Sequence, residues 1–536
     1  MRGCTRTQAL AHRVNDAANA QRRDPVDRGE RALLPRRQRS GRRRFTLTMT
    51  TVFALIALMA TACASSHDGS ATSPGADDAS GSTRPDSPGS GSQDLAAACP
   101  LDDGVTDGTT LEVWHAMVAQ PKTAFEELVD RYNESQDAVT VEVSGYNSFA
   151  ELQAKVRDSL GSDAMPDVVL MEDTTTQWAI DTRSFMPVQA CLDAGGEVAV
   201  DHQFLDHYTV EDTTWAIPVS VATAFLYYNR TMFEQAGLDP DDPPTTLDEI
   251  RSASQTIVDQ GVAPHGMALN LASWIFEHLV LLDGQHIVNN DNGRTARATE
   301  ATLLGAPAEA LFEWTREMTA DSLLMPFEWR PTSIDHFLAM ANGQAAMGIE
   351  SSSALSTVLL VVGGGTVADT GGLDPDALGA DDIDAEGFDI GVAPLPAIGT
   401  GAGGYQAGGA AAFIAEGSSA ADRVGAWDFI SFMSDPDEQA QWHIASSFTP
   451  MSAEAAALPE LQTYWAQTPQ QKLSWEMYQT NGDGEASGPV IGPYDEVRQV
   501  LAAAWFRAAK GDPAAELEDA QQEIDDLLAE YADRVR

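Results

Sequence analysis

Positively charged residues are scarce in this sequence. Its 536 residues include 32 Lys and Arg against 80 Asp and Glu, a formal net charge of −48. The first 62 residues hold 13 of the basic residues and only four of the acidic ones. The remainder therefore has 19 basic and 76 acidic residues, a net charge of −57. A field of this sign repels nucleic acid and anionic lipid, so we expect neither as a direct partner.

Motifs for catalysis and metal binding are also missing. The sequence has no G-x-S-x-G, H-E-x-x-H or Walker-type phosphate loop. His202 and His207 have only a weak metal spacing, and we expect both at the surface without a metal. Glu172 and Asp173 are adjacent carboxylates, but chance pairs are inevitable among so many acidic residues. The acidic segment 363–387 lacks a calcium-loop pattern and is expected to be a solvated loop. We therefore predict no enzyme, no metal and no cofactor.

Long apolar runs are limited to one stretch near the N-terminus. Residues 1–44 are rich in Arg. The apolar run from Phe45 to Ala62 is too short, and contains too many small residues, for a membrane span. This arrangement predicts a signal peptide with a basic N-terminal extension over residues 1–62. Either general secretion or, from Arg42-Arg43, twin-arginine export is compatible with it. Met49 is an alternative start.

The segment after the signal peptide predicts an anchor. Ala60-Thr61-Ala62-Cys63 resembles the site at which bacterial lipoproteins are cleaved and lipidated, which implies lipid attachment at Cys63. Residues 64–94 contain mostly Ser, Gly, Asp and Pro with almost nothing apolar. We expect 63–94 to form a lipidated cysteine followed by a disordered tether.

Cysteines are few and unclustered. Cys4, Cys63, Cys99 and Cys191 form no C-x-x-C pair or Cys/His cluster, which argues against structural zinc. If Cys4 is removed and Cys63 carries lipid, one pair remains in an exported protein. A disulfide between Cys99 and Cys191 is then expected, and two unpaired thiols are the alternative.

The rest of the chain alternates strand and helix patterns. Strands are predicted at Thr110–His115, Val139–Val143 and Val168–Met171, with helices between them at Phe125–Asn133 and Phe149–Leu160. This alternation favours an α/β fold with mostly parallel sheets. The length requires at least two domains.

The stretch from Trp215 to Leu238 is the most informative. Ile217–Tyr228 predicts a strand, Asn229 a helix cap, and Gly237 the end of a short helix. Its pattern, P-x-x-x-x-x-x-x-L-Y-Y-N-R-x-x-F-x-x-A-G-L, resembles the strand between lobes in extracellular solute-binding proteins of ABC importers. The similar group includes maltose-binding and glycerol-3-phosphate-binding proteins. The N-G-x-A-A-M segment at 342–347 resembles the same family, and the resemblance covers about 110–530.

This resemblance implies a two-lobed periplasmic-binding-protein fold of type II with a ligand cleft between the lobes. The implied first lobe is 95–222 plus 392–433, and the implied second lobe is 223–391 plus 434–536. The hinge would lie at Val219–Thr223 and Gly391–Ala393. Residues implied to contact ligand from strand ends and turns are Trp114, Tyr146, Glu172, Asp173, Ser220, Thr223, Trp274, Ser351, Ser352, Tyr405 and Gly409.

One departure from the family bears on the ligand. In the glycerol-3-phosphate-binding branch, a G-x-R-x-G segment provides the arginine that holds phosphate, whereas Val490 stands at that place here. A phosphate without this partner loses its strongest hydrogen bonds. We therefore expect a sugar or oligosaccharide, with glycerol-3-phosphate or a glycerophosphodiester as the alternative.

The implied function is that of a receptor. The resemblance implies a lipid-anchored monomer at the extracellular face of the cell membrane, which delivers a saccharide-like solute to the permease subunits of an ABC importer. Two other classes stay open at this point: a secreted carbohydrate-active enzyme and a cell-wall scaffold without a small ligand.

Overall fold

The computed structural model describes residues 95–330, 333–362, 389–481 and 487–536. The expected signal peptide, the lipid-attachment residue Cys63, the tether and the acidic segment 363–387 all lie outside these residues. Among the helices of the described part, none has the length and apolar character needed to cross a bilayer.

The first sheet has β3 (Val168–Glu172) and β13 (Gly408–Ala415) at its centre, and most of their side chains are buried and apolar or small. Its order is β2 (Val139–Gly145), β1 (Thr109–His115), β3 (Val168–Glu172), β13 (Gly408–Ala415) and β4 (Phe185–Met186), and β7 (Ile217–Ala222) also pairs with β13. β1 pairs in parallel with β2 and β3. β13 runs antiparallel to β3, β4 and β7. We call this sheet and the elements packed on it the first lobe.

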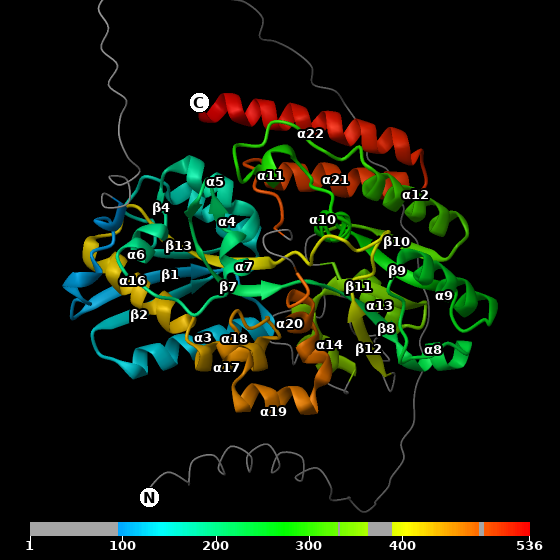
Figure 1. Cartoon of the computed structure of the whole chain (residues 1–536), viewed down its shortest axis with the longest axis horizontal. Helices are drawn as coiled ribbons and strands as arrows, with labels where there is room; N and C mark the ends of the chain where they lie inside the picture. Colours follow the sequence, from blue (N-terminus) through cyan, green and yellow to red (C-terminus); the bar gives the residue numbers. More distant parts are fainter. Residues whose placement is uncertain (1–94, 331–332, 363–388, 482–486) are drawn as a thin grey trace, which may run out of the picture. The chain divides into compact units, whose positions relative to one another are not determined.

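The second sheet has the same kind of mixed pairing. Its order is β10 (Leu324–Glu328), β9 (His265–Leu271), β11 (Ala345–Ser351), β8 (Ala224–Asn229) and β12 (Ile390–Pro394). β9 is parallel to β10 and β11, whereas β8 is antiparallel to β11 and β12. We call this sheet and its helices the second lobe (Figure 1). A separate short hairpin joins β5 (Thr209–Val210) and β6 (Thr213–Thr214).

The predicted α/β class with two lobes is confirmed, but the expectation of mostly parallel sheets needs refinement. β1, β2 and β3 follow one another through helices and are parallel. The strands that cross between the lobes enter the neighbouring sheet from the opposite direction. β8 and β13 are therefore antiparallel to the strands beside them.

Thr223 marks the first crossing between the lobes. The predicted single strand Ile217–Tyr228 is two strands, because β7 ends at Ala222 in the first sheet and β8 begins at Ala224 in the second. As predicted, the side chain of Asn229 caps the following helix by accepting from the amide of Met232.

The return crossing lies later than we expected. All of β12 pairs with β8, and Val392 lies opposite Tyr227 in the second sheet. Gly391 lies opposite Tyr228 in this pairing, and only glycine fits at this position, because a Cβ would lie 2.3 Å from the Tyr228 ring. The return therefore takes place between Pro394 and Gly408, and the expected start of the returning first-lobe segment at 392 is corrected.

Helices cover both sheets. Those placed in the chain before the first crossing are α3 (Ala119–Ser135), α4 (Phe149–Ser159), α5 (Thr176–Thr182), α6 (Gln189–Asp193) and α7 (His202–Asp206). Those between the crossings are α8 (Arg230–Ala236), α9 (Leu247–Asp259), α10 (Ser273–Leu282), α11 (Asn289–Gly293), α12 (Ala306–Ala320), α13 (Asp335–Ala341) and α14 (Leu355–Val362). Short 3-10 turns are η1 (Leu101–Asp103), η2 (Asp173–Thr175), η3 (Ser352–Ala354) and η6 (Pro469–Lys472).

The C-terminal helices divide between the lobes. They are α16 (Ala420–Met433), α17 (Pro436–Ser446), α18 (Ala453–Ala456), α19 (Pro459–Gln467), α20 (Leu473–Tyr478), α21 (Tyr494–Ala508) and α22 (Pro513–Val535). We expected all of 434–536 in the second lobe. Instead, Trp442 on α17 is buried in the first-lobe core, and Glu438 pairs with Arg131 on α3 at 2.6 Å. Trp505 on α21 is buried in the second-lobe core.

The first lobe is also covalently linked. Cys99 and Cys191 form a disulfide with their Cα atoms 5.0 Å apart, and both are fully buried in the first-lobe core. It joins the segment before β1 to α6. Because this link closes a long stretch of chain, it restricts the unfolded state and so stabilises the folded one.

Candidate ligand-binding site

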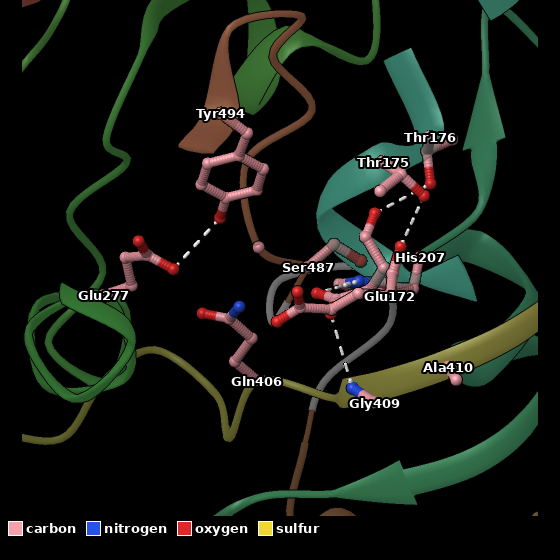
Figure 2. Close-up of polar contacts among 12 residues, drawn as sticks. Glu172, Thr175, Thr176, His207, Glu277, Gln406, Gly409, Ala410, Ser487 and Tyr494 are labelled. Atoms are coloured by element: carbon pink, nitrogen blue, oxygen red, sulfur yellow. Dashed lines mark hydrogen bonds and ion pairs between the residues drawn. The ribbon is translucent and has the colours of Figure 1, made fainter. Parts of the chain in front are cut away.

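A buried carboxylate and a histidine meet at the end of β3. Asp173 directly follows this strand, and its Oδ2 lies 3.2 Å from Nε2 of His207, just after α7. The amide of Gly409, at the start of β13, donates to Asp173 Oδ1 at 3.4 Å (Figure 2). Both side chains are buried, so the expectation that His207 lies at the surface is wrong. Acidic neighbours such as Asp206 and Glu211 suggest an exposed segment, but they do not determine where the His207 side chain points.

The protonation of this pair follows from its surroundings. Burial alone would raise the pKa of Asp173, but the hydrogen bond and charge of His207, with the charge of Arg498, bring it below its usual range. Burial lowers the pKa of His207 despite the nearby Asp173. The pair is therefore an ionised carboxylate and a neutral imidazole. Since an ionised carboxylate can only accept, Nε2 of His207 donates and Nδ1 carries a lone pair.

A second charged group faces this pair from the other lobe. Arg498 on α21 donates to Glu277 on α10 through Nε at 3.2 Å and Nη2 at 3.0 Å. Its guanidinium lies over the ring of Tyr494 at 4.8 Å. Figure 2 shows the Tyr494 hydroxyl, which donates to Glu277 at 3.0 Å. The remaining nitrogen, Nη1, lies 2.9 Å from Oε1 of Glu172 in the first lobe. We call Glu172, Arg498 and Glu277 the Arg498 bridge.

The Arg498 bridge has unequal partners. Glu277 has no exposed side-chain surface, whereas Glu172 keeps 29% of its side chain exposed. Burial raises the pKa of Glu172 to about 7, although Arg498 acts against this shift. Burial also raises the pKa of Glu277, again against Arg498. For Arg498, burial would lower the pKa, but Glu277, Tyr494 and Glu172 raise it well above its usual value. The arginine is therefore charged, and Glu172 is the member that titrates near neutral pH.

Other polar contacts link the lobes beside the Arg498 bridge. Arg294, which follows α11 in the second lobe, donates to the main-chain oxygens of His207 at 3.0 Å and of Gly488. Arg297 donates to Asp181 on α5 at 2.7 Å. Arg157 on α4 lies 3.8 Å from a carboxylate oxygen of Asp495 on α21. The contacts of Arg294 with His207, of Arg297 with Asp181 and of Arg157 with Asp495 join the second lobe to the first.

The first crossing is held by hydrogen bonds at Thr223. Its amide donates to Ser352 Oγ at 3.2 Å, and the Ser352 amide donates to the Thr223 oxygen at 2.7 Å. Ser220 Oγ accepts from the Ala410 amide at 3.0 Å, which ties β7 to β13. The side chain of Ser351 is engaged with Ser353 at 2.8 Å. The side chains of Ser220, Ser351 and Ser352 thus have structural partners of their own, whereas Thr223 bonds through its main chain and its buried Oγ1 has no partner among the described residues.

The four predicted aromatic residues fall in different places. Trp114 is 4% exposed in a first-lobe core, and its indole donates to Glu112 at 2.6 Å, so its ring is not free to stack on a ligand. Tyr146 follows β2 and lies 5.4 Å from the Trp114 ring. Trp274, at the start of α10, is half-buried and meets the edge of His278 at 5.6 Å. Tyr405 is half-buried on the return crossing and packs against core clusters of both lobes.

Several central residues were missed from the sequence. Arg498, His207 and Gln406 sit in segments whose local patterns say nothing of burial. One signal was available: Glu277 and His278 interrupt the otherwise apolar helix Ser273–Leu282. A charged residue in a buried helix is rare unless it is paired, and this position therefore called for a partner elsewhere in the chain.

Known proteins share this architecture. The family described as "Bacterial extracellular solute-binding protein" matches residues 127–469. The sn-glycerol-3-phosphate-binding periplasmic protein UgpB of Rhizobium meliloti is 26% identical over 356 residues, covering 65% of this chain and 76% of the relative. UgpB of Yersinia pestis is 24% identical over 439 residues, covering 79% and 93%.

Solved structures agree with the fold. UgpB from Mycobacterium tuberculosis, in complex with glycerophosphocholine, superposes with a TM-score of 0.64 at 18% identity, covering 79% of this chain and 99% of that one. The cyclic alpha-maltosyl-1,6-maltose binding protein from Arthrobacter globiformis superposes with a TM-score of 0.61 at 22% identity, covering 78% of this chain and 99% of that one. With the two lobes, the double crossing and the family match over most of the folded region, the chain belongs to the bacterial extracellular solute-binding proteins of ABC importers, which are non-catalytic receptors.

Proposed function

We propose that this protein is a lipid-anchored receptor that closes its two lobes around a neutral sugar or oligosaccharide and delivers it to a permease. The observation that carries the choice of ligand is the Arg498 bridge. The only guanidinium among the described residues that reaches Glu172 is already engaged by two carboxylates. The surrounding side chains offer hydrogen-bond acceptors, which suit hydroxyl groups.

The same arrangement disfavours a phosphate ligand. A phosphate gains most from a planar arginine that donates two parallel hydrogen bonds. Arg498 directs its paired donors at Glu277, and Val490, where the related branch has arginine, has a buried apolar side chain. An anion here would have to replace Glu277 or Glu172 and lie beside the ionised Asp173. A hydroxyl group meets no such repulsion.

Closure couples binding to transport in this proposal. Glu172, Asp173 and Gly409 belong to the first lobe, and Trp274 and Arg498 to the second. A ligand that contacts both sets favours the closed form, because the open form offers only one set at a time. Among the residues implied by the family resemblance, we retain Tyr146, Glu172, Asp173, Trp274, Tyr405 and Gly409 as candidate ligand contacts. The hinge residues act through closure.

The proposal includes the route to the membrane. Cys63 would carry the lipid, residues 64–94 would act as tether, and a monomer would deliver its ligand to permease subunits at the extracellular face. Support comes from the segment Ala60–Cys63, which resembles a lipoprotein cleavage site (lipobox), and from the extracellular character of the family.

A glycerophosphodiester is the second candidate. Curated relatives bind sn-glycerol-3-phosphate, and one structure with the same fold holds glycerophosphocholine. Glu172 and Asp173 at the end of β3 favour this candidate over glycerol-3-phosphate itself, because a cationic head group could lie beside their carboxylates.

A thermal-shift panel with product analysis tests the proposal. The panel contains maltose, trehalose, ribitol, sn-glycerol-3-phosphate and glycerophosphocholine. The proposal expects a rise in melting temperature with at least one neutral polyol or sugar, no rise with glycerol-3-phosphate, and recovery of the ligand unchanged. A rise with glycerol-3-phosphate alone would overturn the choice of ligand, and conversion of a sugar to product would overturn the receptor role.

A further inference from the structure

Three of the buried side chains that have polar atoms without a partner among the described residues come from segments at the meeting of the two lobes. They are Nδ1 of His207, Nδ1 of His278 and Oε1 of Gln406. The three residues are only 4%, 5% and 1% exposed. A buried polar atom without a hydrogen bond is destabilising, so such atoms need an explanation in each case. None of the three belongs to the residues implied by the family resemblance.

The three side chains gather on one short segment, 406–409. Gln406 is fixed there because the Tyr478 hydroxyl donates to its main-chain oxygen at 3.2 Å. His278 on α10 approaches the same segment, and its Nε2 lies 3.8 Å from the place of a Cβ on Gly408. The next residue, Gly409, donates to Asp173, which in turn holds His207. Figure 2 shows the Gln406 side chain rising from this segment on the side of Glu277 and Tyr494.

Two of the unpartnered atoms at this place, Nδ1 of His207 and Oε1 of Gln406, can only accept a hydrogen bond. His207 uses its one N–H on Asp173, so its Nδ1 accepts. Gln406 adds an amide oxygen, and Glu172 and Glu277 add carboxylate oxygens. The two buried arginines nearby have their nitrogens engaged: Arg498 with Glu172 and Glu277, and Arg294 with main-chain oxygens. A ligand that satisfies these atoms must itself donate hydrogen bonds.

We infer that His207 and Gln406, with His278 beside them, form a specificity subsite that accepts hydrogen bonds from the hydroxyl groups of an uncharged polyol or sugar end. This inference rests on the proposed function and deepens it, since it names the residues that select hydroxyl donors. A phosphate or carboxylate group brings acceptors and leaves Nδ1 of His207 and Oε1 of Gln406 unpaired. A ligand with the hydroxyls removed does the same, and discrimination of this kind is strong in buried polar sites.

Gln406 is the residue to change, because its buried Oε1 has no hydrogen-bond partner among the described residues. Gln406→Met keeps the size of the side chain and removes both polar atoms. Gln439→Met is the matched control: Gln439 is also buried, but its amide binds the main chain at Ala199, Ser434 and Met451. The control variant therefore loses a structural hydrogen-bonding group at a site outside the proposed subsite.

The measurement is calorimetric affinity for maltose, trehalose and ribitol, with melting temperature recorded for each variant. Gln406→Met is expected to lose at least tenfold in affinity for the sugar that wild type binds best, with a melting temperature equal to or above that of wild type. Gln439→Met is expected to melt earlier and, where folded, to bind as wild type does. Monodeoxy forms of the same sugar add a cross-check. Removing the sugar hydroxyl that donates to Gln406 should weaken binding by the wild type and leave the affinity of Gln406→Met unchanged.

The outcomes separate the inference from the proposed function. If Gln406→Met binds the sugar with an affinity within twofold of wild type, the subsite is overturned and the proposed receptor function is unaffected. A lower melting temperature for Gln406→Met also overturns it, since the amide would then be structural. Wild type that binds none of the neutral compounds overturns the proposed ligand class and the subsite with it.

Discussion

Arg498 Nη1 lies 2.9 Å from Oε1 of Glu172, and this contact joins a C-terminal helix of the second lobe to the end of β3 in the first. Arg498 is held in place by two hydrogen bonds to Glu277 on its own lobe. Arg498, which Glu277 holds within the second lobe, thus also reaches Glu172 in the first lobe.

Removal of Arg498 should destabilise the second lobe. Arg498→Met leaves Glu277 buried without its charge partner and with only the hydrogen bond from Tyr494, and loss of one partner of such a pair typically costs about 3–5 kcal/mol. Arg507→Met on the same helix is the control, because Arg507 keeps 50% of its side chain exposed and the loss of its pair with Glu516 should cost at most about 1 kcal/mol. Denaturant unfolding compares the two variants, and equal stability for Arg498→Met and wild type would contradict the assigned pairing.

Closure should depend on pH through Glu172. Its pKa is about 7 in the closed form against an ordinary 4.5, so the closed form binds the proton more tightly than the open form. The added stability of closure is fully present below pH 4.5 and is lost as the pH rises through 7. The two values set an upper bound of about 3 kcal/mol, which the 29% exposure of the side chain reduces further.

Small-angle scattering from pH 5 to 8 would show this dependence as a rise in the radius of gyration of the unliganded protein. Glu172→Gln mimics the protonated form and should flatten the profile near its low-pH value. A wild-type profile that expands as the pH falls, or a Glu172→Gln profile like that of wild type, contradicts the assignment.

Gly409 should tolerate no side chain. Its φ of 136° lies in the left-handed region, and a Cβ would lie 2.1 Å from the Ser220 carbonyl oxygen. Gly409→Ala should therefore destabilise the first lobe by at least about 2 kcal/mol and displace the amide that binds Asp173. Gly417→Ala, where a Cβ meets nothing within 4 Å, is the control. The free energy of unfolding is the readout, and similar values for the two variants would refute the close approach.

Trp274 should affect binding more than stability. It is half-buried at the start of α10, with its ring against the edge of His278. We expect Trp274→Leu to weaken sugar binding at least tenfold with little change in melting temperature, because stacked aromatic contacts add to affinity beyond their area. Trp505→Leu, in the second-lobe core, should instead lower stability by about 3 kcal/mol or more. The reverse pattern would assign Trp274 to the core.

Cys63→Ala tests the anchor. The lipobox-like segment predicts that this variant is released from the membrane fraction or left unprocessed, because diacylglyceryl attachment needs the thiol. Fractionation and mass determination of the mature N-terminus give the readout. A fully processed Cys63→Ala protein that stays in the membrane would contradict the lipoprotein prediction.

The sequence allowed the fold to be predicted well because its signals are local. The apolar strand Val168–Met171 and the cap at Asn229 are encoded within a few residues, and the structure has both. The position of the return crossing is not local: it depends on the pairing of β12 with β8, which are more than 150 residues apart.

The centre of the site was harder to predict for the same reason. Glu277 and Arg498 are separated by 221 residues, and neither segment indicates the other. Trp114 shows the opposite error, because an aromatic residue near a strand end was expected at the ligand and is instead buried against Glu112. Which of two faces a strand residue occupies depends on the packing of neighbouring helices, and this cannot be read from one strand alone.

The central claim is that the closed lobes hold an uncharged, hydroxyl-rich solute. Side-by-side calorimetric titration of wild-type protein with maltose, trehalose and ribitol, and with sn-glycerol-3-phosphate, tests it most directly. The account predicts saturable binding of at least one neutral compound with one site per chain, and at least a hundredfold weaker binding of glycerol-3-phosphate. Tighter binding of glycerol-3-phosphate than of every neutral compound would contradict it.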